Sequence, residues 1–403
     1  MALLPWIVLL CSAVGSTNTI AFVDQADTPT SQVCVVNVES GDTVAIGPGV
    51  RDGAPQWSPD GSWLAFETGE RSARAIYVVR ADGTDGRQLQ HQKPWNVMPR
   101  WSTDCTRLVY MSATSPGGLG SLAVYDLHTG EEHLWGAGAL GLLRPVWMPF
   151  SKLMRALDPD VLTSVTGMNI DVFRREARME RKDLDEDVLP EALLAIQIVL
   201  GGKSDPGIQT RAVLVTESEV LPFLDIALKE RSEGYGALWQ LEPNWEGARF
   251  GENPRAERLF GTFPLTRNGE ASRLAYESNE GGDREIYVVG GKGKANVTNH
   301  RSADWNPVWS PGGRRLAFES FREVRRAIYT VFTDTALISP IEKGDLSSWS
   351  PSWSPDGEQM ACISDREGGA GLYVVTLKGG KSTRISPQEV IVDWPVWRPE
   401  SRE

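Results

Sequence analysis

The sequence has little of what a metal centre, a disulfide framework or a hydrolase site requires. Its 403 residues include 4 cysteines and 4 histidines, and neither type occurs with the spacing of metal ligands. No serine lies in a Gly-x-Ser-x-Gly turn, which presents the nucleophile in α/β-hydrolases. From the residues alone we expect no catalytic residue, no metal site and no cofactor.

The sequence also has fewer basic than acidic residues. The chain has 41 Lys and Arg against 53 Asp and Glu, which gives a formal net charge of −12. A protein that holds nucleic acid needs a concentrated positive surface, because its main contacts are to phosphates. We therefore expect no nucleic acid partner, and we assign the acidic surplus to keeping a large surface soluble.

The apolar run at the N-terminus is too short for a membrane-spanning helix, which takes about 20 residues. This run, ALLPWIVLLCSAVG at 2–15, has roughly the length of a signal-peptide core, and Ala13 and Gly15 are small residues suited to a cleavage site. We predict a signal peptide at residues 1–15, no transmembrane segment, and a periplasmic or extracellular location. The alternatives are a lipoprotein signal ending at Cys11 and an unusual apolar start with no role in export.

Tryptophan and repetition are what the sequence has in excess. It contains 15 tryptophans, and the stretch WSPDGSWLAF at 57–66 returns as WSPGGRRLAF at 309–318 and as WSPDGEQMAC at 353–362. Seven anchor positions follow one another at steps of 44, 46, 118, 44, 44 and 44 residues: Trp57, Trp101, Trp147, Leu265 (a degenerate copy, LTRNG), Trp309, Trp353 and Trp397. A period of this length built from short strands is typical of a β-propeller and not of a helical solenoid.

One repeat unit contains the signals of a four-stranded sheet. PQW at 55–57 is a short first strand, and SPDG at 58–61 is a tight turn in which Pro fixes φ and Gly adopts a positive φ. LAFET at 64–68 and AIYVVR at 75–80 are the second and third strands, and RQLQ leads into a fourth. Such a sheet cannot bury both faces alone, so we expect radial stacking, with the anchor tryptophans filling the wedges between neighbouring sheets.

The motif WSPDG-x-x-LAF, followed by IYVV and a turn, resembles the WD40-like repeat of TolB-type β-propellers. The resemblance covers about residues 20–150 and 260–398. It implies a propeller fold and, by analogy, partners at the cell envelope. It does not fix a function, because the same repeat occurs in periplasmic scaffolds and in propeller domains attached to peptidases. TolB itself has six blades and an α/β domain ahead of the propeller, and we expect neither here.

The two ends of the chain complement each other. VDWPVW at 392–397 is a first strand with nothing after it, whereas 19–24, 32–38 and 42–47 are second to fourth strands without a first. We therefore predict an all-β propeller of seven four-stranded blades, closed by pairing of the N-terminal strands with the C-terminal strand, so that no sheet edge is left open at the seam. We expect this propeller to be a monomer.

The 118-residue step leaves room for an insertion in the fourth blade. Its apolar periodicity predicts helices at 187–202 and 219–233 and a strand at 211–218, which together form a small α/β insertion. An eighth, degenerate blade, in which KSDPGIQTRAVLVTES is a worn copy of the repeat, is the alternative. The predicted division is a signal peptide at 1–15, a first propeller part at 19–154, the insertion at 155–234 and a second propeller part at 235–398.

Extra tryptophans precede several of the predicted first strands, where a propeller delivers the chain to its central axis. Trp stacks on sugars, peptide aromatics and cations over a large contact area. We predict a site for a protein, peptide or glycan at this central face; its residues are Trp95, Trp305, Trp349, Trp394, Asp304, Asp393 and Asn306. The alternative is that the rings pack between neighbouring loops and seal the channel.

Two functions from different classes fit these observations. The preferred one is a non-catalytic binding scaffold that holds a protein or glycan partner at the cell envelope. The alternative is a propeller enzyme, a lyase or a hydrolase, with acidic residues converging in the central channel. The sequence shows no such set of acidic residues, so we expect the protein not to be an enzyme.

Overall fold

The computed structural model describes residues 18–25, 30–102, 104–116, 118–149, 191–200, 208–215, 217, 220–224, 274–278, 282–290, 293–344 and 346–400. All regular elements in this part of the chain are β-strands, and they form antiparallel sheets. Within it, no helix could span a membrane. The predicted signal peptide, the anchor Leu265 and residues 155–190 lie outside the described residues.

The described strands form seven sheets, and they are numbered here in chain order, starting with the sheet that contains both the first and the last strand. Sheet 1 consists of β27 (Val392–Trp397), β1 (Thr19–Asp24), β2 (Gln32–Asn37) and β3 (Thr43–Ala45); sheet 2 of β4 (Gly53–Trp57), β5 (Trp63–Thr68), β6 (Ala75–Arg80) and β7 (Arg87–Gln88). Sheet 3 consists of β8 (Trp95–Trp101), β9 (Arg107–Ala113), β10 (Ser121–Asp126) and β11 (Glu132–Trp135); sheet 4 of β12 (Leu142–Pro149), β13 (Glu191–Leu200), β14 (Ile208–Val215) and β15 (Val220–Leu224). Sheet 5 contains β16 (Leu274–Ser278), β17 (Glu285–Gly290) and β18 (Gly293–Asn296). By their sequence, LAYES and EIYVVG, β16 and β17 correspond to the second and third strands of the other sheets. Sheet 6 consists of β19 (Asp304–Trp309), β20 (Arg315–Ser320), β21 (Ala327–Phe332) and β22 (Leu337–Pro340); sheet 7 of β23 (Trp349–Trp353), β24 (Gln359–Ser364), β25 (Gly371–Thr376) and β26 (Lys381–Arg384).

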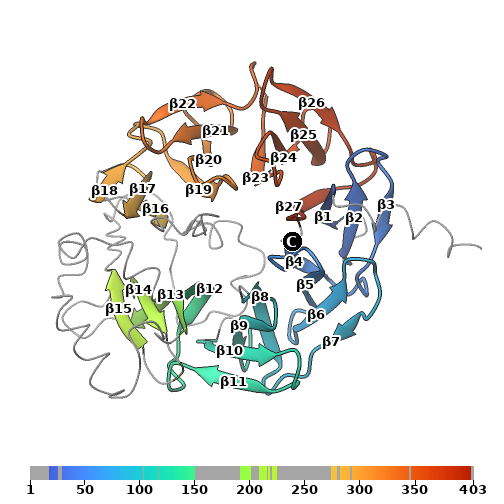
Figure 1. Cartoon of the computed structure of the whole chain (residues 1–403), viewed down its shortest axis with the longest axis vertical. Coiled ribbons are helices and arrows are strands. Elements are labelled where there is room, and N and C mark those ends of the chain that lie inside the picture. Colours follow the sequence, from blue (N-terminus) through green and yellow to red (C-terminus); the bar gives the residue numbers. More distant parts are fainter. Residues whose placement is uncertain are drawn as a thin grey trace, which may run out of the picture.

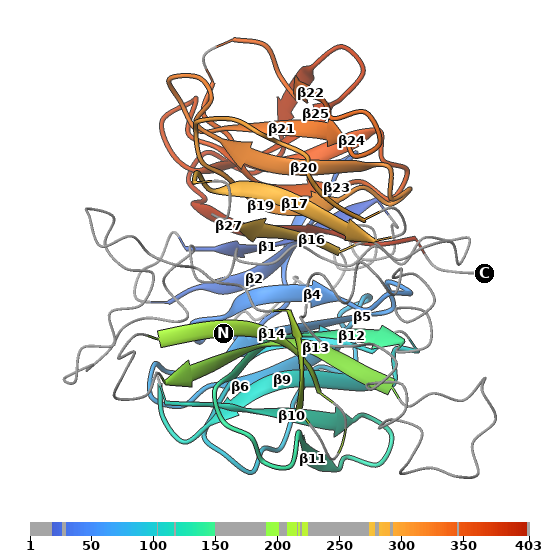
Figure 2. The same cartoon turned by 90° about the vertical axis from the view of Figure 1, so that its left-hand side faces the viewer.

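The sheets are arranged side by side around a central axis, as in a propeller (Figure 1). The first strand of each sheet, such as β4, β8 and β23, lies nearest the axis, and the last strands, such as β7 and β26, lie outermost. Figure 2 shows the strands lying roughly along one axis, with neighbours pointing in opposite directions, so that their connections gather at two opposite sides. The structure is therefore all-β and propeller-like.

The anchor tryptophans whose side chains are described pack between neighbouring sheets, as predicted. Trp57 and Trp101 are each 7 % exposed and pack among apolar side chains of two sheets. The Trp101 indole N–H also crosses the junction and donates a hydrogen bond of 3.0 Å to the carbonyl of Gln56. Trp353 makes the same bond, also of 3.0 Å, to the carbonyl of Val308. Trp101 and Trp353 therefore supply both apolar contact and a directional bond between sheets.

Sheet 1 joins the two ends of the described chain. β27 pairs antiparallel with β1, which in turn pairs with β2, so that Ala21 lies between Val396 on one side and Val35 on the other. Ile20 and Phe22 of β1 are fully buried among residues of sheets 1 and 7. The N-terminal strands are thus held by both hydrogen bonds and core packing.

The α/β character predicted for 155–234 is wrong in the described residues. The segments predicted as helices contain strands β13 and β15, while the strand predicted at 211–218 is confirmed in β14. β13 pairs with β12 on one side and β14 on the other, and its Leu193 and Ala195 are buried. A short, nearly continuous apolar run does not distinguish a buried strand from a buried helix by periodicity alone. Strands β13 to β15 complete sheet 4 and do not form a separate layer.

Backbone hydrogen bonds define one common face of the sheets. At five junctions, an N–H at or just before a first strand donates to the carbonyl that precedes the third strand of the previous sheet: Asn96 to Arg74 (3.0 Å), Leu142 to Gly120 (3.1 Å), Asp304 to Arg284 (2.7 Å), Ser348 to Arg326 (2.9 Å) and Val392 to Ala370 (2.8 Å). The connections into first strands and those from second to third strands therefore lie together, and we call this side the loop face. The turns from first to second and third to fourth strands form the opposite side, the turn face.

Candidate functional site

The predicted site residues lie at the start of first strands, on the loop face. Trp305 and Trp349 occupy equivalent positions, each four residues before the anchor tryptophan of its sheet. Trp95 lies six residues before its anchor and Trp394 three residues before. The extra tryptophans are therefore not one repeated feature, and only Trp305 and Trp349 are in register.

Trp305 and Trp349 meet around an arginine that the sequence analysis did not single out. The Arg326 guanidinium carbon lies 5.7 Å from the ring centroid of Trp305 and 5.4 Å from that of Trp349. Both distances are in the range of a cation–π contact. Arg326 also pairs with the carboxylate of Glu319, which is fully buried. The two rings thus belong to a packed arrangement of an arginine, a carboxylate and aromatic side chains.

Glu319 connects this arrangement to the first strands of two sheets. Its Oε1 accepts a hydrogen bond of 2.7 Å from the Asn306 side chain in sheet 6 and one of 3.0 Å from the Ser350 backbone N–H in sheet 7. Asn306 and Ser350 have φ of 56° and 54° at bulges of these strands. A bulge leaves a backbone group without its ladder partner, and Glu319 supplies an acceptor to one such group.

The same arrangement occurs at two further junctions, and we call it the Glu clamp. Each clamp consists of a buried glutamate near the end of a second strand, an arginine seven residues later, and a bulged backbone N–H in the next sheet. The three clamps are Glu67, Arg74 and Met98; Glu277, Arg284 and Asn306; and Glu319, Arg326 and Ser350. The Glu-x6-Arg spacing is visible in the sequence and could have identified these residues.

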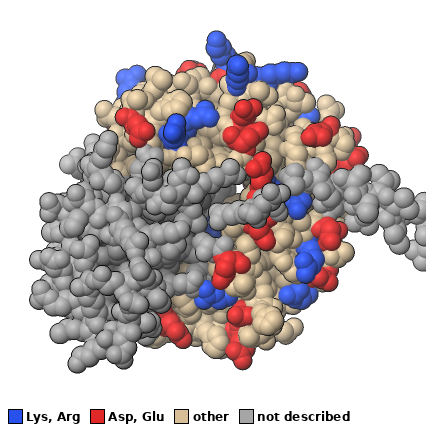
Figure 3. All heavy atoms as spheres, in the orientation of Figure 1, with Lys and Arg blue, Asp and Glu red and all other residues tan. Residues whose placement is uncertain are grey.

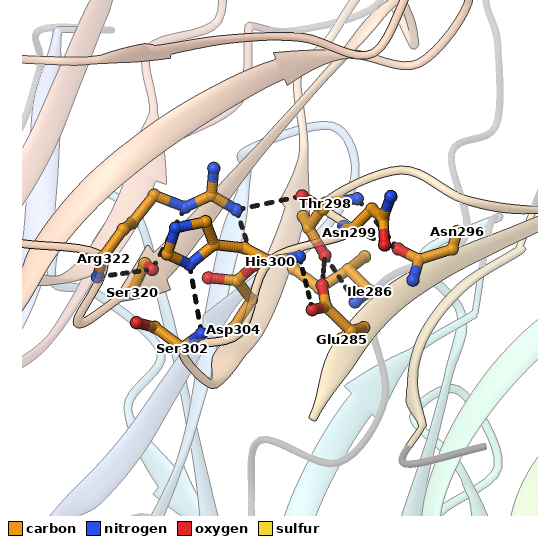
Figure 4. Close-up of polar contacts among 10 residues, drawn as sticks. All are labelled: Glu285, Ile286, Asn296, Thr298, Asn299, His300, Ser302, Asp304, Ser320 and Arg322. Carbon is orange, nitrogen blue, oxygen red and sulfur yellow. Dashed lines mark hydrogen bonds and ion pairs between the residues drawn. The ribbon is translucent and has the colours of Figure 1, made fainter. Parts of the chain in front are cut away.

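Asp304 lies in a second polar network, which links two loops of the loop face (Figure 4). Its carboxylate is fully buried, and Oδ2 accepts a hydrogen bond of 2.6 Å from Arg322 Nη2. Arg322 also donates to the Thr298 carbonyl at 3.2 Å and, through Nε, to Ser320 Oγ at 3.2 Å. The connection into β19 and the connection from β20 to β21 are therefore tied together by one guanidinium.

A second carboxyl group, that of Glu285, closes this network (Figure 4). Glu285 is 3 % exposed and accepts hydrogen bonds from the Thr298 hydroxyl and, at 2.6 Å, from the His300 backbone N–H. Burial raises the pKa of Glu285, and the negative charge of nearby Asp304 adds to the rise, against these two hydrogen bonds. Two acidic groups thus share one buried region with a single described guanidinium, that of Arg322.

The remaining predicted residues lie on other sheets. Trp95 in sheet 3 is 3 % exposed, whereas Trp394 in sheet 1 is half-buried and has a φ of 53°. Asp393 accepts a hydrogen bond of 2.9 Å from the Trp394 backbone N–H and one of 3.3 Å from the Gln25 side chain. Trp95 and Trp305 (9 % exposed) offer little surface to a ligand, while Trp349 and Trp394 retain part of theirs.

Exposed apolar side chains are the feature of the loop face that sequence reasoning missed. Eight large apolar residues are exposed in the described part of the chain, and six of them lie in connections of the loop face: Val50, Leu119, Leu140, Phe321, Val324 and Ile391. The other two, Phe332 and Leu337, flank a turn of the turn face. Most of the exposed large apolar side chains in the described part of the chain thus lie on one face, so the loop face is the better candidate.

The described part of the face seen in Figure 1 shows no continuous basic field of the kind that a polyanion needs. Figure 3 shows basic and acidic side chains interspersed over the described part of the face seen in Figure 1, without a continuous basic field. Within the described residues, no group of three His, Cys, Asp or Glu side chains could hold a metal ion. The described loop face itself offers exposed apolar side chains and a few fixed polar groups.

Comparison with known proteins connects this architecture to TolB-type propellers. Residues 266–403 match the family model of the TolB β-propeller domain, which confirms the resemblance over that part of the chain. A search of curated proteins gives no match.

Three solved structures illustrate the range of similar folds. The β-propeller domain of the trilobed protease from Pyrococcus furiosus aligns with 92 % of this chain and 95 % of its own, at 11 % identity and a TM-score of 0.56. An oligogalacturonate lyase in complex with manganese aligns with 91 % of this chain and 84 % of its own, at 15 % identity and a TM-score of 0.50. TolB from Acinetobacter baumannii aligns with 95 % of this chain and 67 % of its own, at 14 % identity and a TM-score of 0.48. At these identities the likeness is one of fold.

Proposed function

We propose that this protein is a non-catalytic binding scaffold of the TolB-like propeller type, which holds a protein, peptide or glycan partner on its loop face. The observation that carries the proposal is that six of the eight exposed large apolar side chains in the described part of the chain lie on that face. Exposed apolar surface gathered on one side costs solubility and is found where a partner covers it. Trp349 and Trp394, both half-buried, add aromatic contact area there.

The proposed scaffold is a closed ring of seven blades, in which sheets 1 to 7 are the blades and sheet 1 forms the seam. The pairing of β27 with β1 supports closure, and the Glu clamps support rigidity at three junctions. A rigid scaffold favours binding because less conformational freedom is lost when the partner docks. We further propose that residues 1–15 direct export to the periplasm or cell exterior, and that the propeller acts as a monomer.

The enzyme alternative requires acidic groups free to act on a substrate in the channel. Three buried glutamates next to first strands, Glu67, Glu277 and Glu319, are each paired with an arginine and accept a backbone N–H. Carboxylates used in this way stabilise the contact between sheets. This favours the scaffold over a lyase or a hydrolase.

Site-specific photo-crosslinking in cell-envelope extract tests the proposal with the full chain. The photo-reactive amino acid p-benzoyl-phenylalanine would replace Leu140 or Ile391 on the loop face, and Leu337 on the turn face as the matched control. We expect discrete crosslinked products from the two loop-face positions and none from the control. Equal crosslinking from both faces, or none from the loop face, would overturn the proposal.

A further inference from the structure

We infer that His91 is an acid-sensitive switch between sheets 2 and 3, in which protonation of the ring nitrogen Nε2 releases the backbone N–H of Ile76. This inference goes beyond the proposed function and does not depend on it, because the switch is a property of the protein without a partner. Its basis is a buried histidine whose two ring nitrogens are both engaged, at a position where four other sheets use an oxygen atom.

His91 links the two sheets through its two ring nitrogens. Nε2 accepts a hydrogen bond of 3.0 Å from the backbone N–H of Ile76, the second residue of β6 in sheet 2. Nδ1 lies 2.9 Å from the Tyr110 hydroxyl and 3.3 Å from Oε1 of Glu132, and both of these residues belong to sheet 3. The His91 and Glu132 side chains are 5 % and 4 % exposed, and Tyr110 is fully buried. The imidazole is therefore a buried contact between sheets.

These contacts define which ring nitrogen carries the proton. A neutral imidazole has one N–H, and because Nε2 accepts the Ile76 N–H, that proton lies on Nδ1. The Nδ1–H donates to the Tyr110 hydroxyl, which in turn donates to Glu132. Burial raises the pKa of Tyr110, and the negative charge of Glu132 adds to the rise, so this hydroxyl keeps its proton. Hydrogen bonds thus run from the Ile76 backbone to the Glu132 carboxylate.

Protonation of His91 and the bond to Ile76 exclude each other. An imidazolium donates from both nitrogens and accepts at neither, so a proton on Nε2 would face the Ile76 N–H. The negative charge of Glu132, 3.3 Å from Nδ1, acts in favour of the imidazolium. In acid the ring therefore gains an ion pair with sheet 3 and loses its hydrogen bond to sheet 2.

Glu132 keeps its charge over the pH range of this exchange. Burial acts to raise its pKa, but hydrogen bonds from His91, the Tyr110 hydroxyl and the Gln92 backbone outweigh burial and hold the pKa below its ordinary value. The Gln92 side chain also donates to the Glu132 carbonyl at 2.8 Å. The connection between β7 and β8, residues 89–94, therefore stays attached to sheet 3 when Ile76 is released.

Few other titratable groups face the ring. Glu132 on β11, Tyr110 on β9 and Tyr125 on β10 approach it from sheet 3. Lys93, on the same connection as His91, donates to a carbonyl and a hydroxyl group of sheet 3. On the side of sheet 2, Arg74 is held in its Glu clamp. Within the described residues, Glu132 is therefore the charged group in direct contact with the imidazole.

Four other sheets show what is particular about a histidine at this position. In each, the N–H of the second residue of the third strand donates to an oxygen atom of a side chain in the connection to the next sheet: Val33 to Asp52 (3.4 Å), Ile286 to Thr298 (3.0 Å), Ile328 to Ser348 (3.2 Å) and Leu372 to Ser386 (3.0 Å). A hydroxyl oxygen does not titrate in this way, and a carboxyl group keeps acceptor lone pairs when it is protonated. The Nε2 atom of His91 has one lone pair, which a proton removes. Among these five equivalent bonds, the one in sheet 2 is therefore the one that acid can break.

Amide NMR of the full chain tests the switch without a partner. Long-range proton–nitrogen spectra report which nitrogens of the His91 ring are protonated, and hydrogen exchange of the Ile76 amide, corrected for the intrinsic effect of pH, reports its bond. From about pH 7.5 to about pH 5, where histidine ordinarily titrates, we expect the ring to pass from a proton on Nδ1 alone to a proton on both nitrogens. Over the same interval the Ile76 amide should lose about fivefold or more in protection. The internal controls, whose protection should stay constant, are the amides of Ile286, Ile328 and Leu372.

Two variants separate the switch from a general effect of acid. His91→Gln offers a non-titrating oxygen acceptor to the Ile76 N–H, so we expect its Ile76 protection to be independent of pH. Glu132→Gln removes the charge that favours the imidazolium, so the loss of Ile76 protection should move to lower pH.

Three results with the wild type would overturn the inference. The ring could titrate while Ile76 protection stays constant, the ring could stay neutral down to about pH 5, or the control amides could lose protection together with Ile76. An acid-dependent loss at Ile76 in His91→Gln would also overturn it, since the ring would then not be the cause. None of these results bears on the proposed function, which photo-crosslinking tests separately.

Discussion

Glu319 and Ser350 lie on different sheets and are joined directly, since Oε1 of Glu319 accepts the Ser350 backbone N–H at 3.0 Å. The same carboxylate pairs with Arg326, which lies between Trp305 and Trp349. One buried side chain therefore links the second strand of sheet 6, the bulged first strand of sheet 7 and the aromatic side chains of the loop face. The rigidity of the candidate site depends on this contact.

We predict that Glu319→Ala destabilises the protein by about 3–5 kcal/mol, the range for removing one partner of a buried ion pair. The change leaves the Arg326 guanidinium without its carboxylate and the Ser350 N–H without its acceptor. Urea denaturation followed by tryptophan fluorescence would measure the free energy of unfolding. Glu323→Ala, at an exposed position three residues after β20, is the control and should change it by less than about 0.5 kcal/mol. Equal effects of the two changes would contradict a structural role for the clamp.

Two anchor tryptophans, Trp101 and Trp397, allow the contribution of the indole N–H hydrogen bond to stability to be measured. Trp101 donates to the carbonyl of Gln56 at 3.0 Å, whereas Trp397 Nε1 is buried without a hydrogen-bond partner in the described structure. Both rings are nearly buried, at 7 % and 5 % exposure. We predict that Trp101→Phe costs about 1 kcal/mol more than Trp397→Phe, the net contribution of one hydrogen bond. Thermal or urea unfolding of the two variants measures the difference, and a larger loss for Trp397→Phe would show that the bond is not what distinguishes them.

The apolar side chains exposed between β20 and β21 are expected to contribute little to the stability of the fold. Val324 is 91 % exposed and Phe321 is 51 % exposed, so their replacement by serine removes little buried surface. We expect Phe321→Ser/Val324→Ser to lower the free energy of unfolding by less than about 1 kcal/mol, with most of the loss from the Phe321–Trp305 contact. Circular dichroism and urea unfolding would check this, and a large loss of stability would show that these side chains are part of the core.

The sequence predicts those features that repeat. The spacing of Trp57, Trp101, Trp309 and Trp353 locates the inner strands, because each sheet needs a large ring at the same point of its wedge. It fails at β13, whose sequence EALLAIQIVL is apolar at nearly every position, because such a run does not distinguish a strand from a helix.

The candidate site was less accessible to sequence reasoning. Trp305 and Trp349 could be predicted to reach the loop face, but the role of Arg326 depends on which sheets become neighbours. The exposure of Val324 was also hidden, since an apolar residue between two strands gives no periodic signal. Burial and contact between distant segments depend on how the sheets pack together, which the sequence of a single repeat does not determine.

The turn-face aspartates predict a loss of stability in acid. Partial burial acts to raise the pKa of Asp60, but hydrogen bonds from the Ser58 hydroxyl (2.5 Å) and from the Ser62 backbone (3.0 Å) and hydroxyl (2.7 Å) outweigh it and hold the pKa below its ordinary value. The stabilisation is present above the unfolded pKa of about 3.9 and is lost as pH falls through the lower folded value.

We therefore expect Asp60→Asn to be less stable than wild type at about pH 7 and to approach it below about pH 4. Urea unfolding at a series of pH values measures this convergence. Asp334→Asn, an exposed side chain in another turn, is the matched control. A stability difference between Asp60→Asn and wild type that does not change with pH would contradict the assignment.

Glu285 predicts a pH dependence of the opposite sign. Burial raises its pKa, with a further rise from the negative charge of Asp304, so the contribution of this group to stability is fully present below the unfolded pKa of about 4.3 and is lost as pH rises through the higher folded value. Glu285→Gln removes the charge and keeps an oxygen that can accept the His300 N–H, which Glu285 accepts at 2.6 Å.

We expect Glu285→Gln to be at least as stable as wild type at about pH 7, and its advantage to shrink as pH falls toward about 4. The measurement is the free energy of unfolding across this range, with Glu323→Gln as an exposed control on the same face. If Glu285→Gln were less stable than wild type at neutral pH, with the deficit shrinking in acid, the charged form of Glu285 would be the stabilising one. Charges other than Asp304 and Arg322 would then also contribute to the stability of the network around Glu285.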